Sequence, residues 1–180
     1  SIIQRGLAAA EDIFEQLDTE LEQNTGGSIL GEVKGRVKFH NIAFRYPGAQ
    51  RDAISDVSFA VEAGQTVAVV GRSGSGKSTL VKLLARFYTP TGGHITLDGQ
   101  DIQGIELANY REQLAFVPQV INLFSDTVAG NIALGSMSDS SREAVMDAAK
   151  QAQAAGFVSE LESDYDTLIG EQGVGLSGGQ

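Results

Sequence analysis

Residues 66–78 read TVAVVGRSGSGKS, the most informative stretch in this chain of 180 residues. The apolar run Val67–Val70 is typical of a buried strand, predicted for residues 66–70, and a glycine-rich loop follows it directly. After the loop, a helix predicted for residues 77–87 carries apolar residues on one face: Leu80, Leu83, Leu84 and Phe87. A strand, a loop and a helix in this order predict half of a parallel α/β sheet.

The loop fits the pattern G-x-x-x-x-G-K-[ST]. Backbone N–H groups of such a loop, together with the positive end of the following helix, converge on phosphate oxygens. We expect it to bind the phosphates of ATP, with Lys77 near the β and γ phosphates and the Ser78 hydroxyl as a ligand of Mg²⁺. The alternative is a glycine-rich turn with a solvated lysine, which the flanking strand and helix disfavour. The expected phosphate-binding residues are Gly71, Arg72, Ser73, Gly74, Ser75, Gly76, Lys77, Ser78 and Thr79.

The spacing of apolar residues predicts further elements. Period-two alternation predicts strands over 37–44 and 54–61, joined by a turn that contains Pro47 and Gly48. Other strands are predicted at 94–97 and 114–117, and helices at 141–155 and 156–161. These elements together indicate an α/β fold.

The first segment has a helical pattern, with apolar residues at Ile3, Leu7, Ala10, Phe14, Leu17 and Leu21. It predicts an amphipathic helix over residues 1–22 that ends before a Gly- and Ser-containing stretch. We therefore expect three parts: the helix within 1–23, a linker over 24–35 and a globular domain over 36–180.

Composition excludes several classes of function. A formal charge of −10 and a pI near 4.5 argue against a general nucleic-acid-binding surface. The chain has no cysteine, so it contains neither a disulfide nor a thiolate metal site. It also has no apolar run near the roughly 20 residues of a membrane-spanning helix. His40 and His94 fall in predicted strands without a carboxylate or second histidine at ligand spacing, so we interpret them as surface or packing residues.

Residues 176–180 read LSGGQ and are identical to the signature sequence of ATP-binding cassette (ABC) proteins. The chain thus resembles an ABC nucleotide-binding domain, which implies a P-loop NTPase core with an antiparallel β subdomain and part of a helical subdomain. A plain Ser/Gly turn would explain the pentapeptide alone, but not its occurrence together with the loop. The resemblance implies that Ser177, Gly178, Gly179 and Gln180 complete the ATP site of a second copy in a head-to-tail homodimer.

Two further motifs extend the resemblance. Tyr46, in FRYP at residues 44–47, is similar to the aromatic A-loop residue whose ring would stack on adenine. By itself, an aromatic residue at a strand end indicates core or edge packing. Gln119, in FVPQ at residues 116–119, is similar to the Q-loop glutamine, which would join the Mg²⁺ shell and link the core to the helical subdomain. Its alternative is a polar turn residue after Pro118.

Other segments resemble the exporter branch of the family, in particular residues 123–132 and 167–173. Gln172 departs from the arginine common in the latter loop, which leaves a charged contact there in doubt. Residues 1–22 resemble the cytoplasmic extension of an exporter's last transmembrane helix, although a helix packed on its own domain or in a coiled coil is the alternative. Together with RFY at 86–88, they are similar to the MsbA-type lipid A and phospholipid flippases.

The resemblance implies an ATPase that, in complete form, moves a lipid or other hydrophobic substrate from the cytoplasmic face of the bacterial inner membrane. Its partners would be a second nucleotide-binding domain, its own upstream transmembrane domain and the substrate. In the family the catalytic Glu follows the signature, so we expect this chain to bind ATP without rapid turnover, Lys77 and Gln119 being its catalytic residues. The alternatives are a soluble ABC-type ATPase, with the first helix as an oligomerisation element, or a regulatory nucleotide-binding module.

Overall fold

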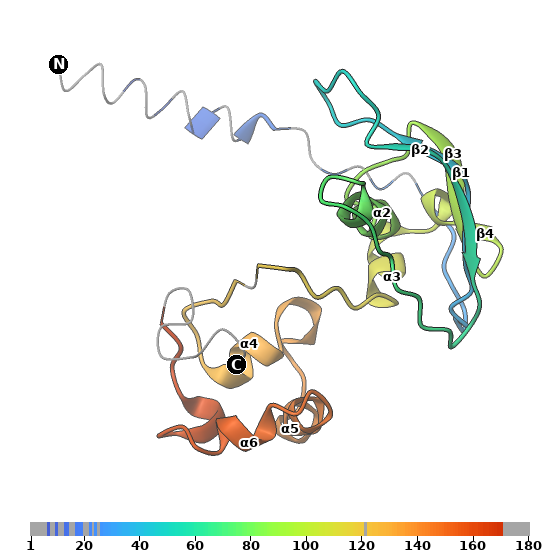
Figure 1. Cartoon of the computed structure of the whole chain (residues 1–180). Helices are drawn as coiled ribbons and strands as arrows, with labels where there is room; N and C mark the ends of the chain where they lie inside the picture. Colours follow the sequence, from blue (N-terminus) through green and yellow to red (C-terminus); the bar gives the residue numbers. More distant parts are fainter. Residues whose placement is uncertain are drawn as a thin grey trace. The chain divides into compact units, whose positions relative to one another are not determined.

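The structure is a computed structural model that describes residues 7, 10, 13, 14, 17–19, 22, 24, 26–120 and 122–170. The chain divides into two compact units, residues 1–116 and 117–180, and each is described by itself (Figure 1). This boundary lies inside the domain predicted for residues 36–180. That predicted domain therefore contains both the sheet of the first unit and the helices of the second.

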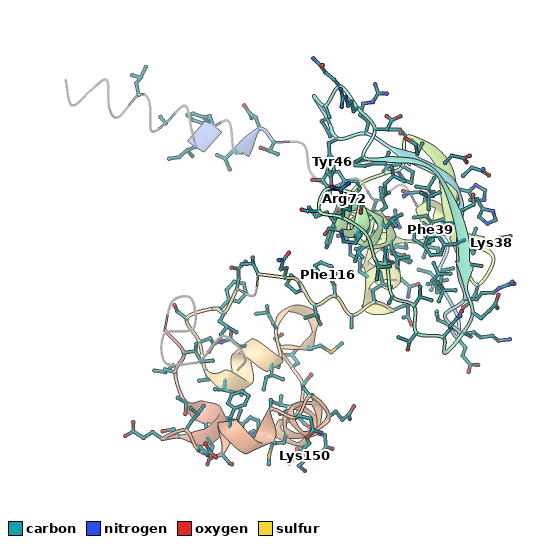
Figure 2. The ribbon with its side chains drawn as sticks, viewed as in Figure 1. Lys38, Phe39, Tyr46, Arg72, Phe116 and Lys150 are labelled. Atoms are coloured by element: carbon teal, nitrogen blue, oxygen red, sulfur yellow. The ribbon has the colours of Figure 1, made fainter. Side chains whose placement is uncertain are left out.

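A four-stranded antiparallel sheet forms the framework of the first unit, in the order β2-β1-β3-β4. The strands are β1 (Val37–Phe44), β2 (Ile54–Val61), β3 (Gly92–Leu97) and β4 (Gln100–Asp101). The predicted strands 37–44, 54–61 and 94–97 are confirmed. Alternation places Phe39 and Lys38 on opposite faces of β1, with Phe39 4% exposed in the core and Lys38 exposed (Figure 2).

Helices pack on the inner face of this sheet. They are α2 (Lys77–Leu84), the 3-10 turn η1 (Ile102–Gly104) and α3 (Leu107–Glu112). Leu83 of α2 and Tyr110 of α3 are fully buried, as expected for one apolar face per helix. The core consists of Phe39, Ile42, Phe44, Ile54, Leu83, Ile95, Leu97, Ile102, Ile105 and Tyr110.

Two of the predicted strands do not form. Residues 66–70 and 114–117 have no strand pairing, and Val69 and Val70 are 44% and 88% exposed. The prediction of half a parallel sheet from residues 66–87 is wrong for its strand, although the helix follows as expected. The physical reason is that a strand needs a neighbour for its backbone N–H and C=O groups, and among the described residues none pairs with either segment.

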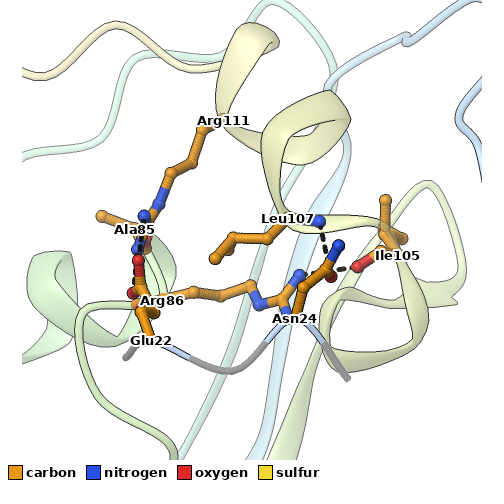
Figure 3. Close-up of polar contacts among 7 residues, drawn as sticks. All are labelled: Glu22, Asn24, Ala85, Arg86, Ile105, Leu107 and Arg111. Carbon is orange, nitrogen blue, oxygen red and sulfur yellow. Dashed lines mark hydrogen bonds and ion pairs between the residues drawn. The ribbon is translucent and has the colours of Figure 1, made fainter. Parts of the chain in front are cut away.

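Two arginines join neighbouring segments of the first unit (Figure 3): Arg111 links the segment before β1 to α3 and to the end of α2, and Arg86 links the end of α2 to the residue Ile105 before α3. The guanidinium of Arg111 donates to both carboxylate oxygens of Glu22, each at 2.6 Å. It also donates to the carbonyl oxygens of Ala85 and Arg86, at 3.3 and 3.1 Å, just after α2. Arg86, only 7% exposed, donates from its side chain to the carbonyl oxygen of Ile105 at 2.7 Å.

The same segment makes further contacts with the start of α3. The Asn24 side chain accepts from the Leu107 N–H at 2.9 Å and donates to Glu106 at 2.8 Å. The N–H of Leu30 donates to Asn109 at 2.7 Å. These residues of the predicted linker are therefore held on the first unit by specific hydrogen bonds.

The second unit is helical. It contains α4 (Val128–Ile132), η2 (Gly135–Met137), α5 (Arg142–Gln151), α6 (Ala155–Val158) and η3 (Asp164–Asp166). The helices predicted at 141–155 and 156–161 correspond to α5 and α6, with shifted ends. Its own core consists of Val128, Val145, Ala149, Val158, Tyr165 and Ile169.

The predicted first helix is described at only a few positions. Leu7, Ala10, Ile13, Phe14 and Leu17 are helical, and the apolar Leu7, Phe14 and Leu17 are exposed. Most other residues of 1–22 lie outside the described part. No helix within the described residues is long and apolar enough to cross a membrane.

Candidate nucleotide-binding site

The ammonium group of Lys77 folds back over the predicted phosphate loop. Lys77 is the first residue of α2, and its Nζ donates to the carbonyl oxygens of Gly71 and Arg72, each at 2.8 Å. It lies 3.5 Å from Ser75 Oγ. Neutral carbonyl groups leave the positive charge uncompensated, and no described carboxylate forms an ion pair with Lys77. The loop thus presents a cation to an incoming anion.

Glycine is required at two points of the loop. Gly74 and Gly76 have φ of +79° and +87°, a region that favours glycine. A Cβ on Gly76 would also lie 2.6 Å from the carbonyl oxygen of Ala53, so the turn packs too closely for a side chain. Gly76 is the N-cap of α2 and offers no side-chain cap. The N–H groups of the first helical turn therefore remain available to phosphate oxygens, which fits the predicted ligand.

Tyr46 lies beside this helix. Its hydroxyl is 3.1 Å from Oγ1 of Thr79, which is 6% exposed. Its ring makes edge-to-face contacts with Phe44 and Tyr88, at centroid distances of 4.9 and 5.1 Å. Figure 2 shows Tyr46 and Arg72 at the same end of the unit. The structure therefore brings the predicted adenine-stacking residue to the predicted phosphate loop.

Tyr88 is a residue of this site that the sequence-based reasoning missed. Its contact with Tyr46 depends on how β1 and the segment after α2 pack. The only available signal was its place in RFY at residues 86–88.

The other predicted site residues are Ser78, Gln119 and the signature residues 176–180. The Ser78 side chain is exposed on α2, next to Lys77, as a Mg²⁺ ligand there would require. Gln119 is an exposed residue of the second unit, so its part in the site stays a prediction. The signature residues 176–180 lie outside the described residues. Within the described part, no three His, Asp or Glu side chains form a metal-binding group.

Comparison with known proteins shows which family this loop belongs to. Residues 54–180 match the ABC transporter family. The chain belongs to this family. The predicted fold class, an ABC-type P-loop NTPase domain with an antiparallel sheet and helices, is thereby confirmed.

Individual relatives make the likeness more specific. The chain is 47% identical over its whole length to the ATP-dependent lipid A-core flippase of Hahella chejuensis (strain KCTC 2396), of which it covers 31%. It is 50% identical to the protein of the same name from Pseudomonas fluorescens (strain Pf0-1), of which it covers 30%. The chain thus spans less than a third of the length of these ABC relatives.

A solved structure supports the same assignment. It is the structure of a bacterial Atm1-family ABC exporter with ATP bound. The match covers 98% of this chain and 31% of the exporter chain, with 41% identity and a TM-score of 0.80. The predicted resemblance to exporter-type ABC domains is confirmed by this match and by the flippase relatives.

Proposed function

We propose that this chain is the ATP-binding part of an ABC exporter that hydrolyses ATP to move a lipid, of the lipid A-core class, across the bacterial inner membrane. The carrying observation is the phosphate loop, in which Lys77 is held as an uncompensated cation beside free N–H groups of α2. The flippase relatives support the substrate class, and the exporter structure supports the transport direction.

Each residue of the site would have a distinct task. Lys77 would leave the loop carbonyls and place its ammonium on the β and γ phosphates. Ser78 would hold Mg²⁺, which neutralises phosphate charge, and Gln119 would complete that shell. The Tyr46 ring, which Phe44 and Tyr88 hold in place by edge-to-face contacts, would stack on the adenine ring.

ATP binding by the chain tests the first step of this proposal. We expect Lys77→Ala to weaken ATP binding by about tenfold to a hundredfold, because a charge-assisted contact contributes about 1.5–3 kcal/mol. Lys82→Ala is the matched control, since Lys82 lies on the same helix and outside the loop. Titration with a fluorescent ATP analogue would measure both. Equal affinities of the two variants would contradict the assigned site.

The complete transporter would work as a dimer. Ser177, Gly178, Gly179 and Gln180 would contact the ATP held by Lys77 of the second copy, which couples ATP binding to closure. Ser177→Arg should then abolish ATP-driven closure and hydrolysis in the full-length protein. Normal hydrolysis by that variant would refute this role. Transport itself is measured by ATP-dependent movement of lipid A in proteoliposomes.

A further inference from the structure

A basic groove crosses the outer face of the sheet, on the side opposite α2. It is lined by Arg36, Lys38, His40, His94, Thr96 and Gly99. Figure 2 shows Lys38 on this face and Phe39 directed to the other side of the sheet. Such a concentration of basic side chains is unexpected in a chain with a formal charge of −10.

The two histidines of the chain meet in this groove. His40 of β1 and His94 of β3 are cross-strand partners, and their rings stack with centroids 4.4 Å apart and planes 10° apart. Their separation of many residues in the sequence hid this pairing. The two residues thus lie at the surface, as expected, and pack on each other: His94 is exposed and His40 is partly exposed.

Irregular backbone beside both residues sets the direction of the two histidine side chains. The register between β1 and β3 shifts just after His40, where Asn41 has a φ of +45°. Gly93, next to His94, has a φ of +74°, and a Cβ there would lie 2.1 Å from the carbonyl oxygen of His40. Bulges of this kind re-aim side chains and recur beside functional sites.

Each carboxylate near the groove already has a hydrogen-bond or ion-pair partner, and one of these partners, Arg36, lines the groove itself. Glu62 pairs with Arg36 at 3.0 Å. The carboxylate of Asp98 accepts from the N–H groups of Lys34, Gly35 and Arg36. Two further acids are also occupied, since Asp56 of β2 accepts from Asn41 and Asp101 of β4 accepts from the N–H of Gln103.

Lys38 is left as an unpaired cation, because no described carboxylate forms an ion pair with it. Its positive charge acts on His40. The pKa of His40 is lowered from its usual value by desolvation, and further by the charges of His94 and Lys38. Ring nitrogens in parallel planes do not converge on one metal ion, and the adjacent Lys38 repels cations. An anion placed in the groove would relieve the repulsion instead.

We propose that this groove is a proton-linked binding site for a dianionic oxyanion of the phosphate type, held by Lys38 and by His40 in its protonated form beside His94. Protons and the anion promote each other's binding, because each stabilises the charge state that the other needs. The site is separate from the phosphate loop and does not depend on the proposed ATP-driven function.

The test follows His40 in the 180-residue chain by proton NMR, which is feasible because the chain has only 2 histidines. Inorganic sulfate is the probe, since it remains a dianion between acidic and neutral pH. In the Lys77→Ala background, which weakens anion binding at the phosphate loop, sulfate should raise the titration midpoint of His40. Sodium chloride at equal ionic strength should not. Protonation of His40 should tighten sulfate binding about tenfold for each pH unit by which saturating sulfate raises that midpoint.

Lys38→Ala should abolish the sulfate effect, and Lys38→Arg should keep it. Lys150→Ala, at an exposed lysine of the second unit, is the control and should change nothing. A His40 titration that is the same in sulfate and chloride, or a sulfate effect that survives Lys38→Ala, overturns the proposal. A response to Zn²⁺ without one to sulfate overturns it in favour of a metal site.

Two sources of the anion are distinguished with the same variants. Inorganic phosphate represents a free anion, and phosphatidylcholine vesicles containing phosphatidic acid represent a lipid headgroup. If the His40 response to one of these probes is lost in Lys38→Ala and kept in Lys150→Ala, the result supports the site, and that probe identifies the source of the anion. Failure of both probes to move His40 contradicts the proposal.

Discussion

At the residue scale, the fully buried Tyr110 makes one polar contact that can be isolated. Its hydroxyl donates to the carbonyl oxygen of Leu84, at the end of α2, where helix carbonyls lack partners within the helix. Burial also raises the pKa of Tyr110, so the hydroxyl stays protonated as a donor. This bond ties α3 to the helix that begins with Lys77.

Tyr110→Phe should therefore lower the free energy of unfolding by about 1 kcal/mol, the usual net value of one such hydrogen bond. Tyr88→Phe is the matched control, because the Tyr88 hydroxyl has no hydrogen-bond partner in the described part of the chain. Urea unfolding measures both. An equal loss of unfolding free energy in the two variants would show that removal of any tyrosine hydroxyl has this effect, and that the hydrogen bond to Leu84 is not responsible.

At the scale of elements, the ion pair between Glu22 and Arg111 holds the N-terminal segment on α3. Both side chains are partly exposed, so we expect a coupling free energy of about 1 kcal/mol in a double-mutant cycle of Glu22→Gln and Arg111→Gln. The Asp147–Lys150 pair, more exposed on both sides, should give less. A cycle without measurable coupling would mean that Arg111 acts only through its hydrogen bonds to the carbonyl oxygens of Ala85 and Arg86 and through the Phe87 ring, over which its guanidinium lies at 5.3 Å.

The pH dependence of that coupling has a defined sign. The hydrogen bond from Arg111 is the main cause that lowers the pKa of Glu22 from 4.5. The unfolded chain then binds the proton more readily, so the contribution is fully present above pH 4.5 and is lost as the pH falls below it. Repeating the cycle at neutral and acidic pH checks this. Coupling that grows on acidification would contradict it.

Local patterns in the sequence predicted the helices and several strands well, but they did not predict which distant segments pair in space. The alternation in residues 37–44 and the apolar face of 77–87 gave β1 and α2 because both depend on residues close in sequence. The run 66–70 was equally apolar, yet a strand also needs a partner, which no local pattern supplies. The same limit applied to contacts between elements. A local motif named the glycines and the lysine of the predicted loop, whereas the contact of Tyr88 with Tyr46 depends on packing between β1 and the segment after α2, and the His40–His94 pair depends on register across the sheet.

At the scale of the whole molecule, the two units have separate cores. One core includes Leu83 and the other Ile169, and both side chains are buried, at 0% and 6% exposure. Cooperative unfolding depends on a shared core, so we expect the units to open independently. Leu83→Ala and Ile169→Ala are matched probes, because each should cost its own unit about 2–5 kcal/mol.

Hydrogen exchange of backbone amides distinguishes independent from common opening. Leu83→Ala should speed exchange in β1 and β3 and leave α5 unchanged, and Ile169→Ala should do the reverse. Amides of residues 66–70 should exchange rapidly in every variant, since they have no strand partner. Equal acceleration in β1 and α5 by either substitution would show that the chain unfolds as one unit.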